Sequence, residues 1–228
     1  MSKNGTGLDE PQLRQVIEEL HRAASGDKWI FLRAAPAVLF DRLRGIPLAR
    51  SVGRFMDKAY IPIAPEVGQL LYLTARANNA KCAVEFGTSF GISGLYLGAA
   101  MRDQGGRFIG TEILPGKAAT ARANLARAGL ADSCEVREGD ALETLRDLAG
   151  PVDLLLLDGW KDLYLPVLNL VKPHLRRGSV VFADNIHTFR KDLAPYVAHM
   201  RDPANGFSST TLPLGSGVEM SVYLGLIP

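Results

Sequence analysis

Acidic and amide side chains directly follow two of the most apolar runs of the sequence. Asp158 follows a run of leucines, and the pair Asp184 and Asn185 follows a later β-rich run. Carboxylate and amide oxygens are hard donors of the kind that Mg²⁺ and similar divalent cations prefer. Lys161 adds an ionisable amine close behind Asp158. One aspartate in such a place is often only a cap or a turn residue, but the four residues together make that reading less favoured and indicate a partial shell for a divalent cation.

Glycines mark the turn after an earlier β-rich run. Residues 85–93 read EFGTSFGIS and lead into a helical pattern. Gly87 permits a tight turn and a close backbone approach, and the N-terminus of the next helix offers unpaired N–H groups to a carboxylate or phosphate. The spacing of Gly87 and Gly91 is not the G-x-G-x-x-G of dinucleotide sites. Because glycines also serve simple strand-to-helix packing, the turn alone leaves both readings open.

Two further acidic residues stand at the ends of neighbouring runs. Glu112 ends the run 107–112, where a carboxylate can accept both ribose hydroxyls of a nucleoside. A strand-end glutamate in solvent is the alternative, and the position favours the nucleoside. Asp140 could bond the edge of an adenine or cap the following helix, and these two roles are compatible.

These residues are positioned by an alternation of short β-rich runs and longer helical patterns. The β-rich runs recur at intervals of roughly 25 residues, as βαβ units do. The expected strands are 82–86, 107–112, 134–137, 152–157 and 179–183, with late strands near 208–212 and 219–224. The expected helices are 92–102, 115–128 with Gly129 as cap, 142–148, 161–175 and 193–200.

The pattern therefore predicts an α/β fold, a doubly wound and mostly parallel seven-stranded sheet of the Rossmann-like kind. Ligands of such sheets bind at the carboxyl ends of strands, where the polar residues stand. The leucines before Asp158 predict a central strand covered on both faces.

Helical patterns also precede the sheet. One covers residues 11–54, and another covers residues 66–78 after a break marked by prolines. We expect residues 1–60 to form an appended helical extension, a lid or dimer contact, and residues 61–228 to form the catalytic domain. The apolar face of the extension predicts packing on the sheet domain or on a second subunit in a homodimer.

Composition narrows the class of protein. The 228 residues are 47% hydrophobic and 22% charged, as is typical of a folded globular domain. The formal net charge is +2, so a nucleic-acid partner is not indicated. No run reaches the roughly 18 apolar residues of a membrane span, and residues 1–7 lack the features of a signal peptide. Cys82 and Cys134 have no metal-ligand spacing, and we expect reduced, buried thiols in a cytoplasmic protein.

The segment 65–185 resembles the catechol and caffeoyl-CoA type of class I O-methyltransferase. PEVGQLL is similar to the P-[DE]-x-G-Q segment of the caffeoyl-CoA branch, and EFGTSFGIS to the E-[ILF]-G-x-x-x-G-x-S cofactor turn. REGDAL at 137–142 resembles R-E-G-x-A-L, and DGWKDLY at 158–164 resembles the D-x-W-K-D-x-Y of the catechol branch. Asp184 and Asn185 match its metal-binding D-N pair. The last two motifs are specific in combination, whereas many methyltransferases share the glycine motifs.

The resemblance implies an enzyme that uses S-adenosyl-L-methionine and a divalent cation, with Mg²⁺ expected. Asp158, Asp184 and Asn185 would ligate the metal, and Lys161 would be the general base for the hydroxyl that is methylated. The cofactor would be bound by Gly87 and Ser93 at its methionine end, by Glu112 at its ribose, and by Asp140, Ala141 and Trp160 around its adenine, with Glu85 as a further cofactor-binding residue. The acceptor would be a small vicinal-dihydroxy compound, which we expect to be aromatic.

Departures from the family leave the acceptor open. Gly159 stands where the family usually has His or Ala, which predicts a more open adenine pocket. Segments 39–60 and 201–217 match neither branch, and no counterpart appears of the glutamate that grips the second hydroxyl in the catechol branch.

Three alternatives remain. One keeps the cofactor without the metal and takes another small-molecule acceptor. An NAD-dependent oxidoreductase is the second, and the missing G-x-G-x-x-G counts against it. A non-catalytic nucleoside-binding module is the third, in which the lysine beside three oxygen donors would have no use.

Overall fold

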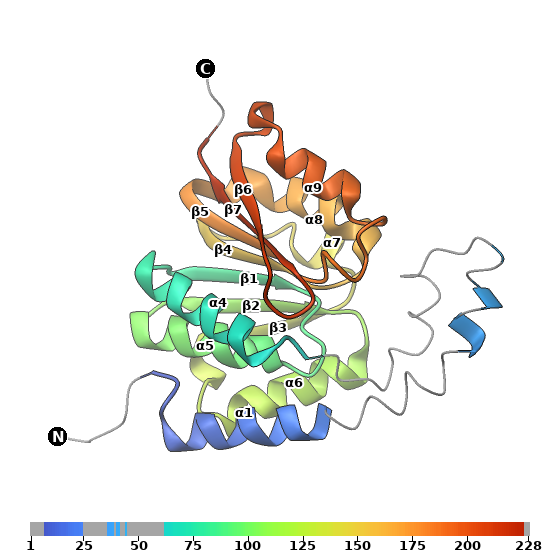
Figure 1. The fold of residues 1–228 in the computed structure, drawn as a ribbon. Coiled ribbons are helices and arrows are strands. Elements are labelled where there is room, and N and C mark those ends of the chain that lie inside the picture. The colour runs from blue at the N-terminus through green and yellow to red at the C-terminus, as the bar shows by residue number, and fades with distance from the viewer. Residues whose placement is uncertain (1–6, 25–35, 39, 42–43, 45–61, 226–228) are drawn as a thin grey trace.

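The computed structural model describes residues 7–24, 36–38, 40–41, 44 and 62–225. Figure 1 shows a central sheet with helices on both sides. Most of the predicted extension 1–60, including most of the helical pattern beyond Ala24, lies outside the described residues. The domain boundary after residue 60 therefore stays a prediction.

One sheet contains seven strands in the order β3-β2-β1-β4-β5-β7-β6. They are β1 (Cys82–Phe86), β2 (Arg107–Glu112), β3 (Cys134–Glu138), β4 (Val152–Leu157), β5 (Leu175–Ala183), β6 (Phe207–Leu212) and β7 (Val218–Tyr223). The first five strands pair in parallel, whereas β7 runs antiparallel to β5 and β6. The strand order reverses between β1 and β4, which is where such sheets bind ligands. The predicted doubly wound, mostly parallel sheet is confirmed.

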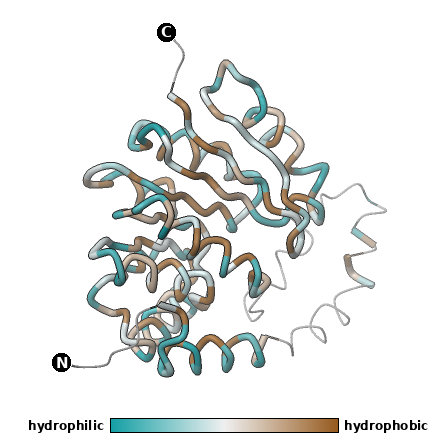
Figure 2. Tube along the Cα trace, turned by 60° about the vertical axis from the view of Figure 1, so that its left-hand side comes forward, coloured by the Kyte–Doolittle hydropathy of each residue, from teal (hydrophilic) through white to brown (hydrophobic). Residues whose placement is uncertain are grey.

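Helices cover both faces of the sheet because its central strands are apolar on both faces. One face carries α4 (Pro65–Ala77), α5 (Ile92–Gln104) and α6 (Pro115–Arg127); the other carries α7 (Ala141–Thr144), α8 (Tyr164–Val171) and α9 (Ala194–Arg201). In β4, Leu154 and Leu156 join the first core, while Leu155 and Leu157 join the second. Brown apolar segments accordingly run through the middle of Figure 2, and β4 is the predicted central strand.

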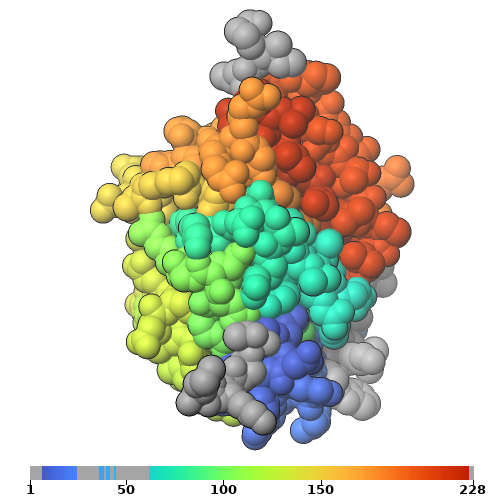
Figure 3. Space-filling model, turned by 90° about the vertical axis from the view of Figure 1, so that its left-hand side faces the viewer, coloured from blue at the N-terminus to red at the C-terminus, as the bar shows by residue number. Residues whose placement is uncertain are grey.

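The described part of the N-terminal region is a helix packed on the sheet domain. α1 (Pro11–Ala24) buries Leu13, Ile17 and Leu20 and contacts α5 and α6. Arg102 of α5 forms an ion pair with Glu10 ahead of α1. Figure 3 shows α1 in blue beside the teal and green elements that follow it. Packing on the sheet domain, one of the two predicted alternatives, is therefore observed for α1.

The expected helix 142–148 is wrong in length, because α7 ends at Thr144. The guanidinium of Arg137 donates to the carbonyl oxygens of Thr144 at 2.7 Å and of Asp147 at 3.3 Å. The arginine thus provides hydrogen-bond partners for carbonyl groups at and beyond the C-terminal end of α7, which have no partner within the helix.

The region between β4 and β5 also differs from the expectation. The helical pattern 161–175 is divided into the 3-10 turn η3 (Lys161–Leu163), α8 and the 3-10 turn η4 (Lys172–His174), and β5 begins at Leu175. The pairing of β5 shifts register after Leu175. Ser179 bridges this irregularity, because its hydroxyl accepts from Arg176 N at 2.9 Å and donates to the Val152 carbonyl at 2.6 Å.

Candidate active site

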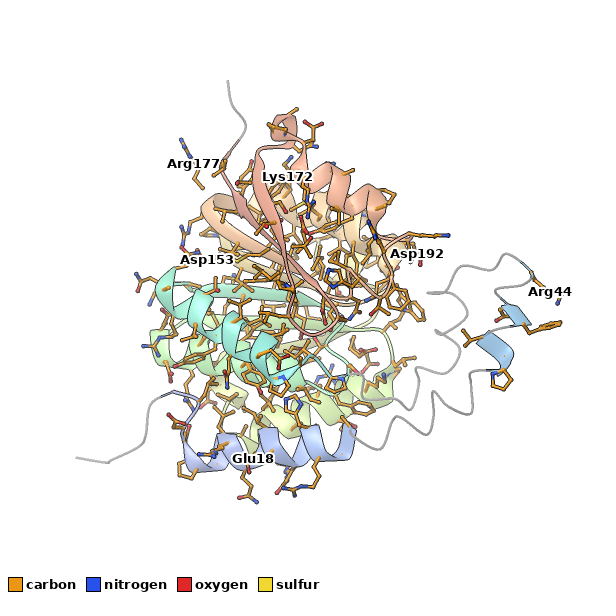
Figure 4. All side chains as sticks on the ribbon, in the orientation of Figure 1. Glu18, Arg44, Asp153, Lys172, Arg177 and Asp192 are labelled. Carbon is orange, nitrogen blue, oxygen red and sulfur yellow. The ribbon has the colours of Figure 1, made fainter. Side chains whose placement is uncertain are left out.

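The carboxyl ends of the central strands meet at one edge of the sheet. Phe86 of β1 lies beside Leu157 of β4. The backbone N–H of Asp158 donates to the Phe86 carbonyl at 2.9 Å, and that of Asp184 donates to the Leu157 carbonyl at 3.1 Å. Figure 4 labels Asp153 at the opposite, amino end of β4. The predicted gathering of the strand-end residues is therefore present.

Glycines let the turns after β1 and β4 approach each other closely. A Cβ atom on Gly87, whose φ is +94°, would lie 2.6 Å from Gly159 Cα and 2.8 Å from the carbonyl carbon of Asp158. A Cβ atom on Gly159 would lie 2.5 Å from Cζ of Phe86. The Phe86 ring thus fills the space that a side chain at position 159 would need, and the more open adenine pocket stays a prediction.

A small pocket lies between the glycine turn and the segment that precedes α4. It is lined by Pro62, Ile63, Gly87, Thr88, Ser89, Phe90, Ile92, Ser93 and Asp158. Gly87, Ser93 and Asp158 are predicted site residues. Thr88 and Ser89 were missed, although their place as polar residues between two glycines was a signal. Pro62 and Ile63 stand before α4 and carry no such signal.

Glu85 is a buried carboxyl in β1. It has no exposed surface, and Ser93 of α5 donates to its Oε1. Burial raises the pKa of Glu85 to about 7, because the ionised form loses its hydration. Its Oε2 and the hydroxyl of Thr88 are buried and meet no hydrogen-bond partner within the part of the chain that the structure describes. These atoms suit a polar ligand group at the turn.

Replacing this carboxyl tests its ionisation. The pKa of about 7 lies above the ordinary value of 4.5, so the folded state holds a proton that the unfolded state releases. The stability contributed by Glu85 is complete below about pH 4.5 and is lost as the pH rises through about 7. We expect Glu85→Gln to raise the free energy of unfolding at pH 8 by about 1–3 kcal/mol and to flatten its decline between these pH values, measured by urea denaturation. An unchanged pH profile would contradict a titrating Glu85.

Glu112 ends β2 and is not the solvated glutamate of the alternative reading. It is only 8% exposed. Its Oε2 accepts from Ser89 N at 2.8 Å and its Oε1 accepts from Leu114 N at 2.9 Å. Each oxygen keeps further acceptor capacity, so this fixed carboxylate can accept two ribose hydroxyls. That role stays a prediction.

The three residues predicted at the adenine follow β3 and β4. Asp140 caps α7, since its Oδ1 accepts from Leu142 N at 2.8 Å, and this confirms the capping role. Ala141 is buried as the first residue of α7. Trp160 is 37% exposed, and Ile113 after Glu112 is 54% exposed. Asp140, Ala141 and Trp160 are not among the described residues that line the small pocket, so their contact with the adenine stays a prediction.

Lys161 is 7% exposed, which excludes the solvated helix lysine of the alternative reading. Its Nζ lies 3.6 Å from Asp158 Oδ1 and donates to Tyr164 Oη at 2.9 Å. Tyr164 in turn donates to the backbone carbonyl of Asp184 at 3.2 Å. The amine also lies 5.4 Å from the ring centroid of Phe189. The predicted base therefore lies beside Asp158 and is linked through Tyr164 to the backbone of Asp184.

Ser216, in the loop between β6 and β7, joins Asp184 to Asn185. Its hydroxyl donates to Asp184 Oδ1 at 2.9 Å and accepts from Asn185 Nδ2 at 2.8 Å. Asn185 has a φ of 68°, in the left-handed region that asparagine tolerates, and its backbone N–H donates to Asp184 Oδ1 at 2.7 Å. Ser216 was missed because its segment 201–217 matches no motif.

Burial at this edge of the sheet disfavours the charged forms of Asp158, Asp184 and Lys161. Burial raises the pKa of Asp158, and the nearby charge of Asp184 raises it further. Burial also raises the pKa of Asp184 and lowers that of Lys161. Shifts of this kind, in a cleft, are typical of functional sites.

The donor set fits a hard divalent cation. Asp158, Asp184 and the Oδ1 atom of Asn185 offer only oxygen, and a cation would offset the repulsion between the two carboxylates. Within the described ranges, no group of three or more His, Cys, Asp or Glu side chains could hold a metal ion. The present set contains two such side chains and an amide, so metal binding stays a prediction.

The strand order, the glycine turn after β1 and the acidic end of β2 are those of a Rossmann-like α/β fold. Residues 84–186 match the family described as a methyltransferase domain. The chain is 39% identical over 134 residues to the catechol O-methyltransferase of Mycobacterium tuberculosis, and this match covers 57% of the chain and 60% of that protein. It is 34% identical over 130 residues to the catechol O-methyltransferase of Niastella koreensis, covering 55% of the chain and 58% of that protein. The chain thus spans about 60% of the length of these curated relatives.

Solved structures agree with the sequence relatives. The cofactor-bound protein Rv0187 from MTB gives a TM-score of 0.68 at 28% identity, covering 77% of this chain and 87% of that one. The O-methyltransferase from Bacillus cereus in complex with SAH gives a TM-score of 0.70 at 23% identity. This match covers 92% of this chain and 90% of that one, and it supports the fold. The predicted resemblance to class I O-methyltransferases of the catechol and caffeoyl-CoA type is confirmed. None of the described helices is long and apolar enough to cross a membrane.

Proposed function

We propose that this protein is a metal-dependent O-methyltransferase that transfers a methyl group from S-adenosyl-L-methionine to a hydroxyl of a small vicinal-dihydroxy compound. The observation that carries the proposal is the buried amine of Lys161 at the ligand edge of the sheet, 3.6 Å from Asp158 Oδ1 and linked through Tyr164 to the backbone of Asp184. The relatives named catechol O-methyltransferase support an aromatic diol as acceptor.

The residues at the first two strand ends suit the cofactor. Glu112 offers a fixed carboxylate to the ribose hydroxyls. The buried polar atoms of Glu85 and Thr88 at the glycine turn suit the amino-acid end. S-adenosylmethionine, when bound, supplies a methyl group on a positively charged sulfur. Trp160 and Ile113 would cover its base with their exposed apolar surfaces.

Asp158, Asp184 and Asn185 would hold the divalent cation, which would supply a positive charge that makes an acceptor hydroxyl more acidic. Lys161 then accepts the hydroxyl proton on Nζ, and burial lowers the pKa of this amine, which makes its neutral, proton-accepting form easier to reach. Ser216 keeps Asp184 and Asn185 in one orientation. The oxygen would be held in line with the methyl group, so that positioning lowers the barrier.

A metal-independent methyltransferase is the second candidate. It is favoured by the contacts of Ser216, which already give Asp184 and Asn185 hydrogen-bond partners without a cation. In this reading the three polar residues only shape a pocket for another acceptor, and added metal would leave turnover unchanged.

Calorimetric titration with S-adenosylhomocysteine tests the cofactor assignment. We expect one site per chain, and we expect Glu112→Ala to weaken binding by about 10- to 100-fold, because two hydrogen bonds to a charged group are lost. Glu135→Ala is the matched control, since that glutamate is exposed on β3 and pairs with Arg137. No binding by the unsubstituted protein would contradict the cofactor assignment, and equal binding by the Glu112 variant would contradict the role of that residue.

A further inference from the structure

We propose that Tyr164 is a positioning residue that holds the amine of Lys161 in the orientation needed to take the acceptor proton. This inference rests on the proposed function and deepens it. Tyr164 is the first residue of α8 and has no exposed surface. Its hydroxyl therefore reaches the reaction only through the groups that it contacts.

The two hydrogen bonds of the Tyr164 hydroxyl have a defined direction. A phenol has one proton, and this proton is donated to the backbone carbonyl of Asp184 at 3.2 Å. The lone pairs are then left to accept, and Lys161 Nζ donates to them at 2.9 Å. The carbonyl belongs to the backbone of the β5 end, so it cannot rotate away.

This bond matters because the other contacts of the amine are loose. The distance from Nζ to Asp158 Oδ1 is 3.6 Å, longer than a hydrogen bond. The rings of Tyr164 and Phe189 lie with their centroids 5.0 Å and 5.4 Å from Nζ, and such contacts attract a cation without fixing its rotation. Among the described residues, the Tyr164 hydroxyl thus sets the direction in which one N–H points, and the lone pair points elsewhere.

The step that gains from this arrangement is the proton transfer. The acceptor O–H bond breaks, its proton moves to the Nζ lone pair, and the oxygen forms a bond to the methyl carbon as the carbon–sulfur bond breaks. S-adenosylhomocysteine leaves with that electron pair on sulfur. A lysine free to rotate would present its lone pair to the acceptor only part of the time, and loss of alignment lowers the rate more than it lowers binding.

Tyr196 offers a matched control. It is 2% exposed and packs edge to face on Tyr164, with ring centroids 5.6 Å apart. Its hydroxyl is buried and meets no hydrogen-bond partner in the described part of the chain. Tyr196→Phe therefore removes a hydroxyl from the same cluster without touching Lys161.

The test is a double-mutant cycle with catechol, Mg²⁺ and S-adenosylmethionine. We expect Tyr164→Phe to lower kcat by about 10- to 100-fold, with the KM for catechol and the calorimetric Kd for S-adenosylhomocysteine within about twofold of the unsubstituted protein. Tyr196→Phe should leave kcat within about twofold. In a Lys161→Met background, Tyr164→Phe should change the residual kcat by less than about twofold, because the partner through which it acts is gone.

The other outcomes of this cycle distinguish failure of the positioning role from failure of the proposed function. An equal loss of kcat in both backgrounds, or no loss in either, would overturn the positioning role while leaving the methyltransferase in place. Absence of transfer by the unsubstituted protein would overturn the proposed function and this inference with it. Because Tyr164→Phe removes one hydroxyl and keeps the buried ring, its thermal melt is recorded first, and kcat is compared at a temperature below the melting transition of every variant.

Discussion

Replacing Lys161 with methionine is expected to lower kcat by about 10²- to 10⁴-fold, the usual contribution of a general base. Methionine keeps the length and the apolar stem of the side chain but cannot take a proton. The affinity for S-adenosylhomocysteine should stay within about twofold, because Lys161 is not among the predicted cofactor residues. Steady-state kinetics with catechol and calorimetry measure the two quantities.

Stability provides the control for this variant. Lys161→Met leaves the buried carboxyl of Asp158 without the amine that lies 3.6 Å from it, so the melting temperature is expected to fall, and kcat is compared below the melting transition of both proteins. A folded Lys161→Met protein that keeps kcat within about threefold would contradict the role of the lysine as base.

Asp184→Asn is expected to remove most metal-dependent turnover, with a fall in kcat of about 10²-fold or more at a fixed low concentration of Mg²⁺. The substitution keeps the volume of the side chain and an oxygen that can accept from Ser216, but it removes one charge from the donor set. Burial raises the pKa of Asp184, so its ionised form destabilises the fold. Activity should therefore fall while the melting temperature rises, a combination that a purely structural aspartate does not show.

Asp153→Asn is the matched control for this variant. Asp153 is 4% exposed and lies at the opposite end of β4. Its carboxylate accepts from Lys81 N at 2.6 Å and Cys82 N at 2.9 Å and pairs with Arg176 at 2.5 Å. Its replacement should cost about 1–3 kcal/mol of stability and leave the dependence of kcat on Mg²⁺ unchanged. The metal assignment would fail if both variants lost stability and kept the same metal dependence.

Much of the fold was predictable because each strand is marked in the sequence by its own short β-rich run. The leucines of β4 belong alternately to the two cores, as a strand covered on both faces requires. The places where prediction failed depend on contacts between distant residues. Arg137 donates to two carbonyl groups at and beyond the end of α7, and Ser179 joins the early part of β5 to β4. No local pattern contains such contacts.

The candidate site shows the same division. Asp158, Lys161 and Asp184 could be predicted, because strand ends in a parallel sheet meet at one edge. The alternative reading of Lys161 as a solvated helix residue was excluded only by its burial. Ser216 comes from a loop far along the chain, and the contact of Gly159 with the Phe86 ring depends on two strands lying side by side. Segment 39–60, expected to help choose the acceptor, lies mostly outside the described residues.

Transfer of a labelled methyl group from S-adenosylmethionine to catechol, before and after chelation of divalent cations, tests the proposed function most directly. We expect a monomethyl ether of catechol as product, loss of transfer after chelation, and recovery on addition of Mg²⁺. Undiminished transfer after removal of divalent cations would contradict the role of the metal and would favour the metal-independent methyltransferase. Absence of transfer under every condition, together with no binding of S-adenosylhomocysteine, would contradict the assignment as a methyltransferase.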